Sequence, residues 1–181
     1  MSLLRMTVRN KWIQDHFGPT AMAALLILIV GLTALAAGQP WLFPSLGPTA
    51  YLLAKYPDLS SSRIYNCIVG HLVGLAGGFA AVAIFNAWQA PLVPLDHVTT
   101  TRIWAATLAV ALTVLGNSLL KSGHPPAAAT TLLVALGTFE TAKDALIVVV
   151  GVLILVAAGE GFRRLKLGLL RLSQYPDESR R

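Results

Sequence analysis

Residues 20–38 read TAMAALLILIVGLTALAAG and contain no charged side chain. A helix needs about 20 predominantly apolar residues to cross the hydrocarbon core of a bilayer, so this run is long enough to span it. The whole chain agrees, because 55% of its 181 residues are apolar, 12% are charged and the mean hydropathy is +0.67. Soluble domains carry about 25% charged residues. The composition therefore predicts a membrane protein and argues against a soluble enzyme, a disordered chain or a DNA-binding domain.

Three further apolar runs are long enough, or nearly so, to form spans: Ile64–Trp88, Ile103–Leu120 and Ala145–Gly159. The last run extends to Phe162 if Glu160 lies at the membrane interface. The tryptophans fall near the ends of the runs, as in an interfacial aromatic belt, at Trp12, Trp41, Trp88 and Trp104. The sequence thus predicts an all-α integral membrane protein with four long transmembrane helices.

Basic residues flank this region on both sides. They are Arg5, Arg9 and Lys11 before it, and Arg163, Arg164, Lys166, Arg171, Arg180 and Arg181 after it. By the positive-inside rule we expect residues 1–16 and 163–181 to be cytoplasmic and residues 17–162 to form the membrane domain. No aromatic residues or motif point to nucleic acid, and the first run is too long for a cleaved signal peptide. We predict a multi-pass protein of the bacterial inner membrane.

Two shorter segments, Phe43–Tyr56 and His124–Thr138, each open with proline and run into small residues and a Leu-Leu pair. A shift of 80 residues places Leu52-Leu53 on Leu132-Leu133. The pattern predicts two related repeats, at about 17–88 and 100–162, each a long helix, a short Pro-initiated half-helix and a long helix. Re-entrant half-helices would give four spans and parallel halves, which segment length favours. Crossing half-helices would give six passes and an inverted 3+3 repeat, which the Lys and Arg distribution mildly favours.

The starts of the short segments carry chemistry. Proline at the beginning of a helix fixes where the helix starts, and free N–H groups would remain at residues 49–51 and 127–129. A helix N-terminus carries partial positive charge and attracts anions, so we predict a small-anion site where the two starts meet. The candidate binding residues are Ser45, Gly47, Thr49, His71, Asn117, His124, Pro125, Pro126, Ala127, Ala128 and Thr130.

Two features of the second run allow two interpretations each. His71 is the ionisable residue deep in that run, where such residues are functional candidates, although a neutral histidine can also simply bond a neighbouring helix. Gly70, Gly74 and Gly78 recur on one face, a spacing that lets two backbones approach closely. We expect this face to pack within the molecule, with a homo-oligomer interface as the alternative.

Signatures of catalysis are absent from the sequence. It contains no paired carboxylates, HExxH, GxSxG or phosphate-binding loop, and its single cysteine, Cys67, allows neither a disulfide nor a CxxC metal site. Glu160 precedes Arg163 and Arg164 by one helical turn, as in an interfacial ion pair. We therefore expect no enzymatic activity, no cofactor and no metal.

Residues 123–133, GHPPAAATTLL, resemble the signature of the HPP family of integral membrane proteins. Residues 44–53, PSLGPTAYLL, resemble that family's other marked segment, which is usually closer to PFGASAVLL. Gly70-His71-Leu72 matches a third element, and the resemblance covers about residues 17–162 in the family's order. Ala128 replaces a common glycine and Pro48 replaces an alanine, both where an ion would approach the backbone.

The resemblance implies a four-span protein, and family members in cyanobacteria and chloroplasts are implicated in nitrite transport. Some relatives carry a C-terminal CBS regulatory pair, which we do not expect here. The resemblance implies transport, and the paired helix starts point independently to an anion. We expect a channel or secondary transporter for a small inorganic anion, most simply nitrite. The alternatives are an intramembrane enzyme or metal-binding protein that uses His71 and His124, and a scaffold without transport.

Overall fold

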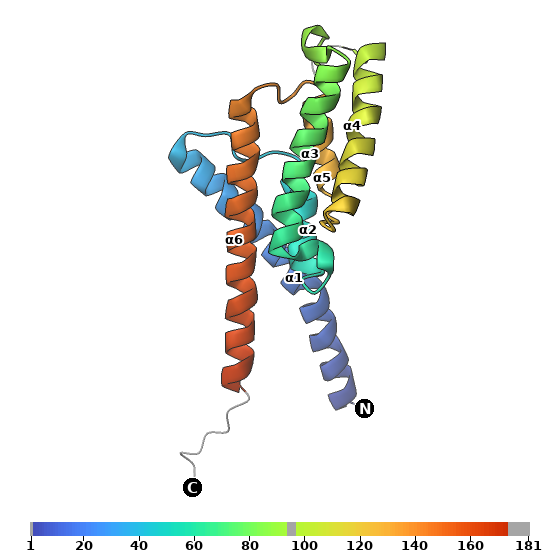
Figure 1. The fold of residues 1–181 in the computed structure, drawn as a ribbon. Coiled ribbons are helices and arrows are strands. Elements are labelled where there is room, and N and C mark those ends of the chain that lie inside the picture. The colour runs from blue at the N-terminus through green and yellow to red at the C-terminus, as the bar shows by residue number, and fades with distance from the viewer. Residues whose placement is uncertain (1, 94–96, 174–181) are drawn as a thin grey trace.

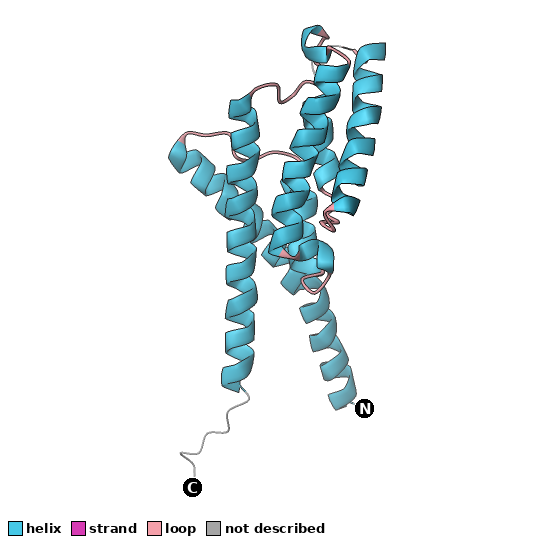
Figure 2. Ribbon diagram, viewed as in Figure 1, coloured by secondary structure: helices cyan, strands magenta, loops and turns pink. Residues whose placement is uncertain are grey.

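A computed structural model describes the backbone of residues 2–93 and 97–173, and the side chains of residues 16–93 and 97–165. Within these ranges the chain is helix and loop, without strands (Figure 2). The helices are α1 (Ser2–Ala37), α2 (Leu46–Lys55), α3 (Ile64–Ile84), α4 (Thr100–Leu119), α5 (Ala127–Ala135) and α6 (Ala142–Ser173), with short 3₁₀ turns at Ser60–Ser62 and Ala87–Gln89.

Four helices contain segments that are long and apolar enough to cross a membrane: His16–Ala37, Ile64–Ile84, Thr100–Leu119 and Ala142–Leu165. The prediction of four long helices and two half-helices is confirmed. The boundaries differ most from those expected at three ends. Helix α1 begins at Ser2, so it includes most of residues 1–16, which were expected to lie outside the membrane domain. The second span ends at Ile84 instead of Trp88, and α6 continues beyond Phe162 to Ser173, through part of the segment expected as a tail.

The direction of each helix follows from Figure 1. We call the end of the bundle at which α1 begins and α6 ends the terminal side. The long helices α1 and α3 run away from the terminal side, whereas α4 and α6 run toward it. The half-helix α2 runs toward the terminal side and α5 away from it. Because α1 and α3 run in the same direction, the chain between them returns through α2 and its connecting segment, and α5 has the same role between α4 and α6. These directions are those of the six-pass alternative, not those expected for re-entrant half-helices.

Helix α3 is at the centre of the bundle and contacts α4, α5 and α6. Its glycines make these close contacts possible. A Cβ added at Gly70 would lie 2.6 Å from Cβ of His124, and one at Gly78 would lie 2.8 Å from Cβ of Val134. At Gly74 the added atom would lie 2.7 Å from the carbonyl oxygen of Ala127. The glycine face is thus covered by α5 and its preceding loop, in agreement with the expectation that this face packs within the molecule.

The apolar core lies between α1, α2, α3 and α6 and extends to α4 and α5. Its fully buried members include Leu26 and Val30 of α1, Leu46 of α2, and Val148 and Leu155 of α6. Many leucines on the outer faces of α1, α4 and α6 are exposed, as expected for helices that face lipid.

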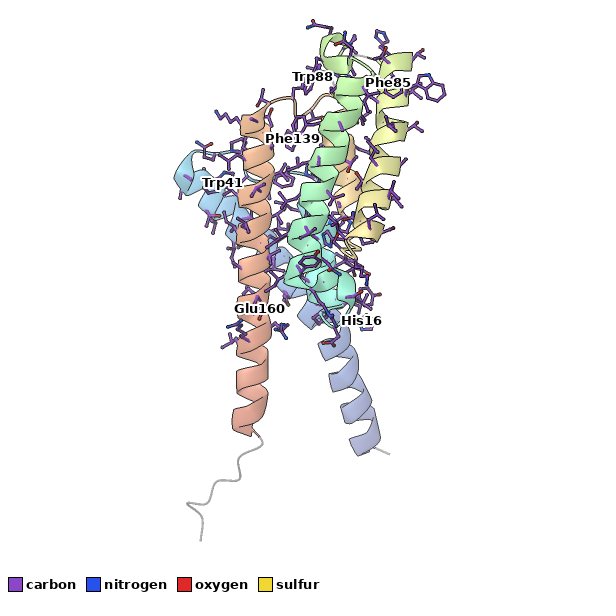
Figure 3. All side chains as sticks on the ribbon, in the orientation of Figure 1. His16, Trp41, Phe85, Trp88, Phe139 and Glu160 are labelled. Carbon is purple, nitrogen blue, oxygen red and sulfur yellow. The ribbon has the colours of Figure 1, made fainter. Side chains whose placement is uncertain are left out.

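The ends of the bundle carry polar and aromatic side chains. Figure 3 places Phe85 and Trp88 at the end away from the terminal side, whereas His16 and Glu160 lie toward the terminal side. Glu160 forms ion pairs of 2.7 Å with Nε of Arg163 and 2.8 Å with Nε of Arg164, as the sequence predicted. Of the four tryptophans expected in the aromatic belt, Trp12 lies outside the described side chains.

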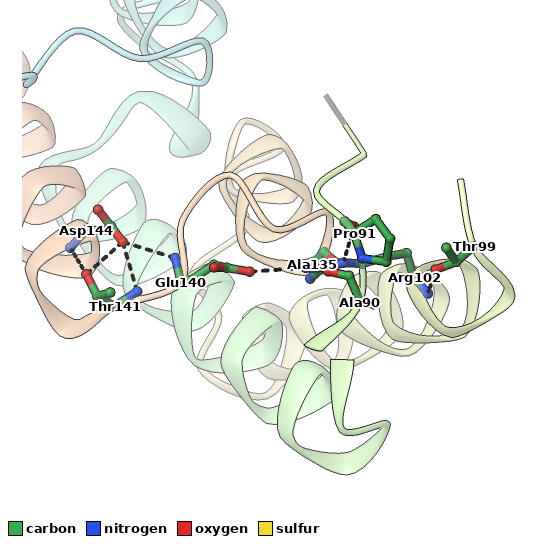
Figure 4. A network of polar contacts seen from close by, with 8 residues as sticks. All are labelled: Ala90, Pro91, Thr99, Arg102, Ala135, Glu140, Thr141 and Asp144. Carbon is green, nitrogen blue, oxygen red and sulfur yellow. Dashed lines mark hydrogen bonds and ion pairs between the residues drawn. The ribbon is translucent and has the colours of Figure 1, made fainter. Parts of the chain in front are cut away.

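At the end of the bundle opposite the terminal side, a buried arginine forms hydrogen bonds that connect three segments of the chain (Figure 4). Arg102 of α4 is 0% exposed, and its guanidinium donates to the carbonyl oxygens of Ala90, Pro91 and Ala135 at 2.9, 3.2 and 3.2 Å. Its Nη2 also lies 3.1 Å from Oε1 of Glu140. Ala135 is the last residue of α5, so the positive charge lies where the helix dipole is negative. Arg102 therefore ties α4, α5 and the loop after α3 together.

Candidate functional site

The two half-helices start beside each other at mid-height in the bundle and run in opposite directions (Figure 1). Ser45, the N-cap residue of α2, lies 2.8 Å from Thr130 of α5, measured between their hydroxyl oxygens. Both side chains are fully buried. The structure therefore brings together the two Pro-initiated starts that the sequence singled out.

The backbone amides at these starts already have acceptors. In α5 the N–H groups of residues 127, 128 and 129 donate to the carbonyls of residues 124, 125 and 126, at 3.0, 3.1 and 3.1 Å. These are 3₁₀-type bonds, which satisfy the first amides of a helix. The expectation that the three alanines present free N–H groups is therefore wrong.

The first backbone amides of α2 are also hydrogen-bonded within the chain. The amides of Leu46 and Gly47 donate to carbonyls three residues back, at 3.1 and 3.2 Å, and Pro48 has no N–H. Because the helix begins at Leu46, residues 49–51 lie beyond its first three positions and make ordinary helical bonds. The predicted free amides are absent here too. Gly47 is exposed, and an added Cβ would meet no atom within 4 Å, so it lies apart from the buried site.

The hydrogen-bonding groups gathered at the two helix starts belong to side chains and not to free backbone amides. His71 of α3 and His124 of the loop before α5 are each 2% exposed, with ring centroids 5.0 Å apart. The hydroxyl oxygen of Thr49 lies between them, 3.1 Å from Nε2 of His71 and 3.2 Å from Nε2 of His124. Two histidines far apart in the sequence thus contact one hydroxyl on α2.

Each imidazole has a second partner. Nδ1 of His71 lies 2.6 Å from Oγ1 of Thr130. Nδ1 of His124 lies 2.8 Å from the carbonyl oxygen of Ser61, which can only accept, so this nitrogen carries hydrogen. The side chains of Ser45, Thr49, His71, His124 and Thr130 form one continuous hydrogen-bonded chain, which we call the histidine network.

A cavity of about 900 Å³ opens beside this network, where α3 begins and α4 ends. His124 and Ser61 line it, so the network touches the cavity through the ring that bonds Ser61. Two basic side chains, Arg63 and Lys121, also line it, and none of its lining residues is acidic. The cavity lies toward the terminal side, and we call it the basic vestibule.

The vestibule separates the candidate residues into two groups. Asn117, His124, Pro125 and Ala128 line it. The other buried candidates, Ser45, Thr49, His71, Pro126, Ala127 and Thr130, do not line it. Asn117 is positioned by its neighbour, because its side-chain oxygen accepts a 2.8 Å bond from the hydroxyl of Ser122.

Sequence reasoning missed three contributors to the site. Arg63 and Lys121 were counted in the sequence only as part of the Lys and Arg distribution that indicates topology. Arg63 directly precedes one span and Lys121 follows the next, so the two would lie close together if these spans formed a hairpin. The carbonyl of Ser61 could not be found from its residue type, because any residue supplies one.

A second hydroxyl cluster holds the half-helix against its neighbours. Oγ1 of Thr131 lies 2.7 Å from Oγ1 of Thr113 on α4 and 3.1 Å from the carbonyl oxygen of Gly74 on α3. These atoms belong to the face of α5 beside the one that holds Thr130. Thr131 and Thr113 therefore fix the orientation of α5 and, through it, the position of Thr130.

These features define a class. A bundle of four membrane-length helices that encloses two half-helices and a buried polar network is an all-helical integral membrane protein. Residues 9–175 match the family described as "HPP, transmembrane region", and the chain belongs to that family. Neither a curated protein nor a solved structure matches the chain. The three sequence elements that carry the family resemblance supply the side chains of the histidine network.

Proposed function

We propose that this protein is a channel or secondary transporter for a small inorganic anion, with nitrite as the leading substrate. The observation that carries the proposal is the basic vestibule, which has two cationic side chains, no acidic one, and a buried histidine in its wall. A cleft of one charge sign with low-dielectric walls concentrates ions of the opposite sign. The vestibule therefore favours the approach of anions over cations.

The satisfied amides change which groups would contact the ion. Direct ligation by the helix starts is not available, because their N–H groups already donate to protein carbonyls. In the proposal the ion is held by Arg63 and Lys121 at the opening and by Asn117 and His124 farther in. The partial positive charge at the start of α5 still adds a favourable field.

The order of helix directions supports transport. Helices α1–α3 run away, toward and away from the terminal side, and helices α4–α6 run in the opposite order (Figure 1). An inverted pair of repeats with a site at interrupted helices is a common plan for secondary transporters. We therefore propose that the two halves are inverted repeats, despite their low sequence identity.

The basic flanks indicate the orientation. Lys55, Arg63 and Lys121 lie toward the terminal side, whereas Arg102 and Lys143 lie at the starts of α4 and α6. Because basic residues concentrate on the cytoplasmic side, we propose that the terminal side is cytoplasmic in a bacterial inner membrane. The proposal assigns the chain no catalytic step, and its partners are the anion and the bilayer.

Flux through purified protein in liposomes tests the proposal. We expect nitrite to enter faster than into empty vesicles, and alkali cations not to enter. Opposite charges 4 Å apart attract by about 1 kcal/mol in a water-like dielectric. Arg63→Gln and Lys121→Gln should therefore each raise the apparent KM about fivefold, since about 1.4 kcal/mol is one decade.

Lys143→Gln is the matched control, because it removes a positive charge at the opposite end of the bundle. Cation flux without anion flux would reject the proposal. An unchanged apparent KM in the Arg63 and Lys121 variants would place the ion path elsewhere.

A further inference from the structure

We propose that His71 and His124 share a single proton through the hydroxyl of Thr49, and that this proton moves together with the transported anion. The inference rests on the proposed anion transport and deepens it by naming the coupling ion. It is carried by the geometry of the histidine network, in which both Nε2 atoms face one hydroxyl oxygen at 3.1 and 3.2 Å.

The hydrogen-bond inventory defines where a proton can be. Nδ1 of His124 donates to the carbonyl of Ser61, so the nitrogen of neutral His124 without hydrogen is Nε2. Nε2 is also the nitrogen that faces Thr49. The one site on His124 that can gain a proton therefore faces the path to His71.

The two locations of the proton use the same heavy-atom positions. The hydroxyl of Thr49 also lies 3.0 Å from the carbonyl oxygen of Ser45, so its one hydrogen turns from this carbonyl to a ring nitrogen when the pair holds a proton. With the proton on His124, Nε2–H donates to Thr49, the hydroxyl of Thr49 donates to Nε2 of His71, and Nδ1–H of His71 donates to Thr130. Transfer moves the Nε2 proton of His124 to the oxygen of Thr49, while the original hydroxyl proton of Thr49 moves to Nε2 of His71. His71 is then the cation, and Thr49 donates back to Nε2 of His124. Every ring nitrogen is hydrogen-bonded in both states.

The surroundings favour one proton at most. The ring centroids are 5.0 Å apart in a buried site, so two imidazolium charges would repel each other strongly. No carboxylate lines the vestibule to offset a second charge. The titratable or charged groups around the pair come from every adjoining segment. They are Tyr51 and Lys55 of α2, Tyr56 and Asp58 between α2 and Ser60, Arg63, Tyr65 and Cys67 at the start of α3, Arg102 of α4, Lys121 after α4, and Lys143, Asp144, Glu160, Arg163 and Arg164 of α6, whereas α5 has none.

The location of the pair links the proton to the anion. His124 lines the vestibule, whereas His71 lies behind it against α5, so transfer through Thr49 carries positive charge away from the opening. A monovalent anion that binds beside His124 is attracted by the same charge. Binding of each ion therefore favours binding of the other, which is the thermodynamic requirement for coupling.

The experiment uses the full chain in liposomes with nitrite outside, an alkaline interior and the membrane potential clamped at zero by potassium and valinomycin. A one-to-one symporter should accumulate nitrite about tenfold per pH unit, above the level in empty vesicles. Thr49→Val removes the bridging hydroxyl at nearly constant volume and should reduce this accumulation at least tenfold. Thr49→Ser retains the hydroxyl and should preserve it.

Thr113→Val is the matched control, because it removes a buried hydroxyl of the neighbouring cluster and leaves the histidine network intact. It should accumulate nitrite as the unmodified protein does. If the pH gradient causes no accumulation at zero potential, while a potential imposed by a potassium gradient with valinomycin does drive nitrite flux, the shared proton is refuted and anion transport stands.

A second readout is independent of flux. In ¹⁵N-histidine NMR of the protein in micelles, the rings of His71 and His124 should change together as one proton is taken up, and Thr49→Val should separate their responses. This result in a protein that passes no nitrite would support the shared proton and reject the proposed transport. Independent titration of the two rings in the unmodified protein would overturn the inference.

Discussion

Gly70→Ala tests the close contact on which the placement of His124 depends. The added methyl carbon would lie 2.6 Å from Cβ of His124, whereas carbon atoms in favourable contact are about 3.5–4.0 Å apart. The two groups must therefore separate by about 1 Å. Overpacking of this kind costs about 1–3 kcal/mol, and alanine recovers about 0.5–1 kcal/mol because it favours helix more than glycine does.

The displacement also affects the network. His124 already lies 3.2 Å from Thr49, so a further shift of about 1 Å takes the pair beyond hydrogen-bond distance. We expect Gly70→Ala to lower the midpoint of thermal unfolding in detergent and to reduce nitrite flux. Gly161→Ala on α6 is the control, because its added Cβ meets no atom within 4 Å and should leave the protein as stable or slightly more stable. Equal stability and flux in the two variants would refute the packing described for Gly70.

Two further predictions concern buried side chains outside the network. Arg102→Gln leaves three carbonyl oxygens and Glu140 without their charged donor, and hydrogen bonds to charged groups contribute about 1.5–3 kcal/mol each. We therefore expect the free energy of unfolding in detergent to fall by several kcal/mol. A variant as stable as the unmodified protein would show that Arg102 does not hold α5. Cys67 is fully buried and its thiol lies 3.6 Å from the carbonyl oxygen of Ser61. It should therefore react with a membrane-impermeant maleimide only after denaturation, and rapid labelling of the folded protein in micelles would contradict the packing of α3.

The long helices could be predicted because each is an apolar run of membrane length, a property that local sequence contains in full. Their directions could not. The half-helices are too short to cross a membrane as helices, which favoured re-entry. The non-helical residues 39–43 supply part of the distance between the end of α1 and the start of α3, and a rule that counts only helical residues leaves them out. The distribution of basic residues was the better guide, because Arg63 and Lys121 lie on the same side as the chain ends.

The site shows a similar division. The candidate list contained every side chain of the histidine network, but the predicted chemistry placed the ion on free amides. Those amides are satisfied by 3₁₀-type bonds and by Pro48, a detail of the first helical turn that composition does not reveal. The pairing of Thr49 with both histidines joins positions 22 and 75 residues apart, so it depends on the tertiary fold.

The shortness of α2 has a consequence for biosynthesis. Its ten residues rise about 15 Å, half of the roughly 30 Å hydrocarbon core. Such a segment cannot enter the bilayer by itself, because the connection before it would leave backbone groups unpaired in lipid. Helix α3 must therefore be held in the same orientation as α1 before α2 is seated, and Arg63, directly ahead of α3, provides the charge that keeps that end on the terminal side. We therefore expect membrane insertion of this chain in two stages, in which the long helices provide the cavity and the half-helices enter it afterwards.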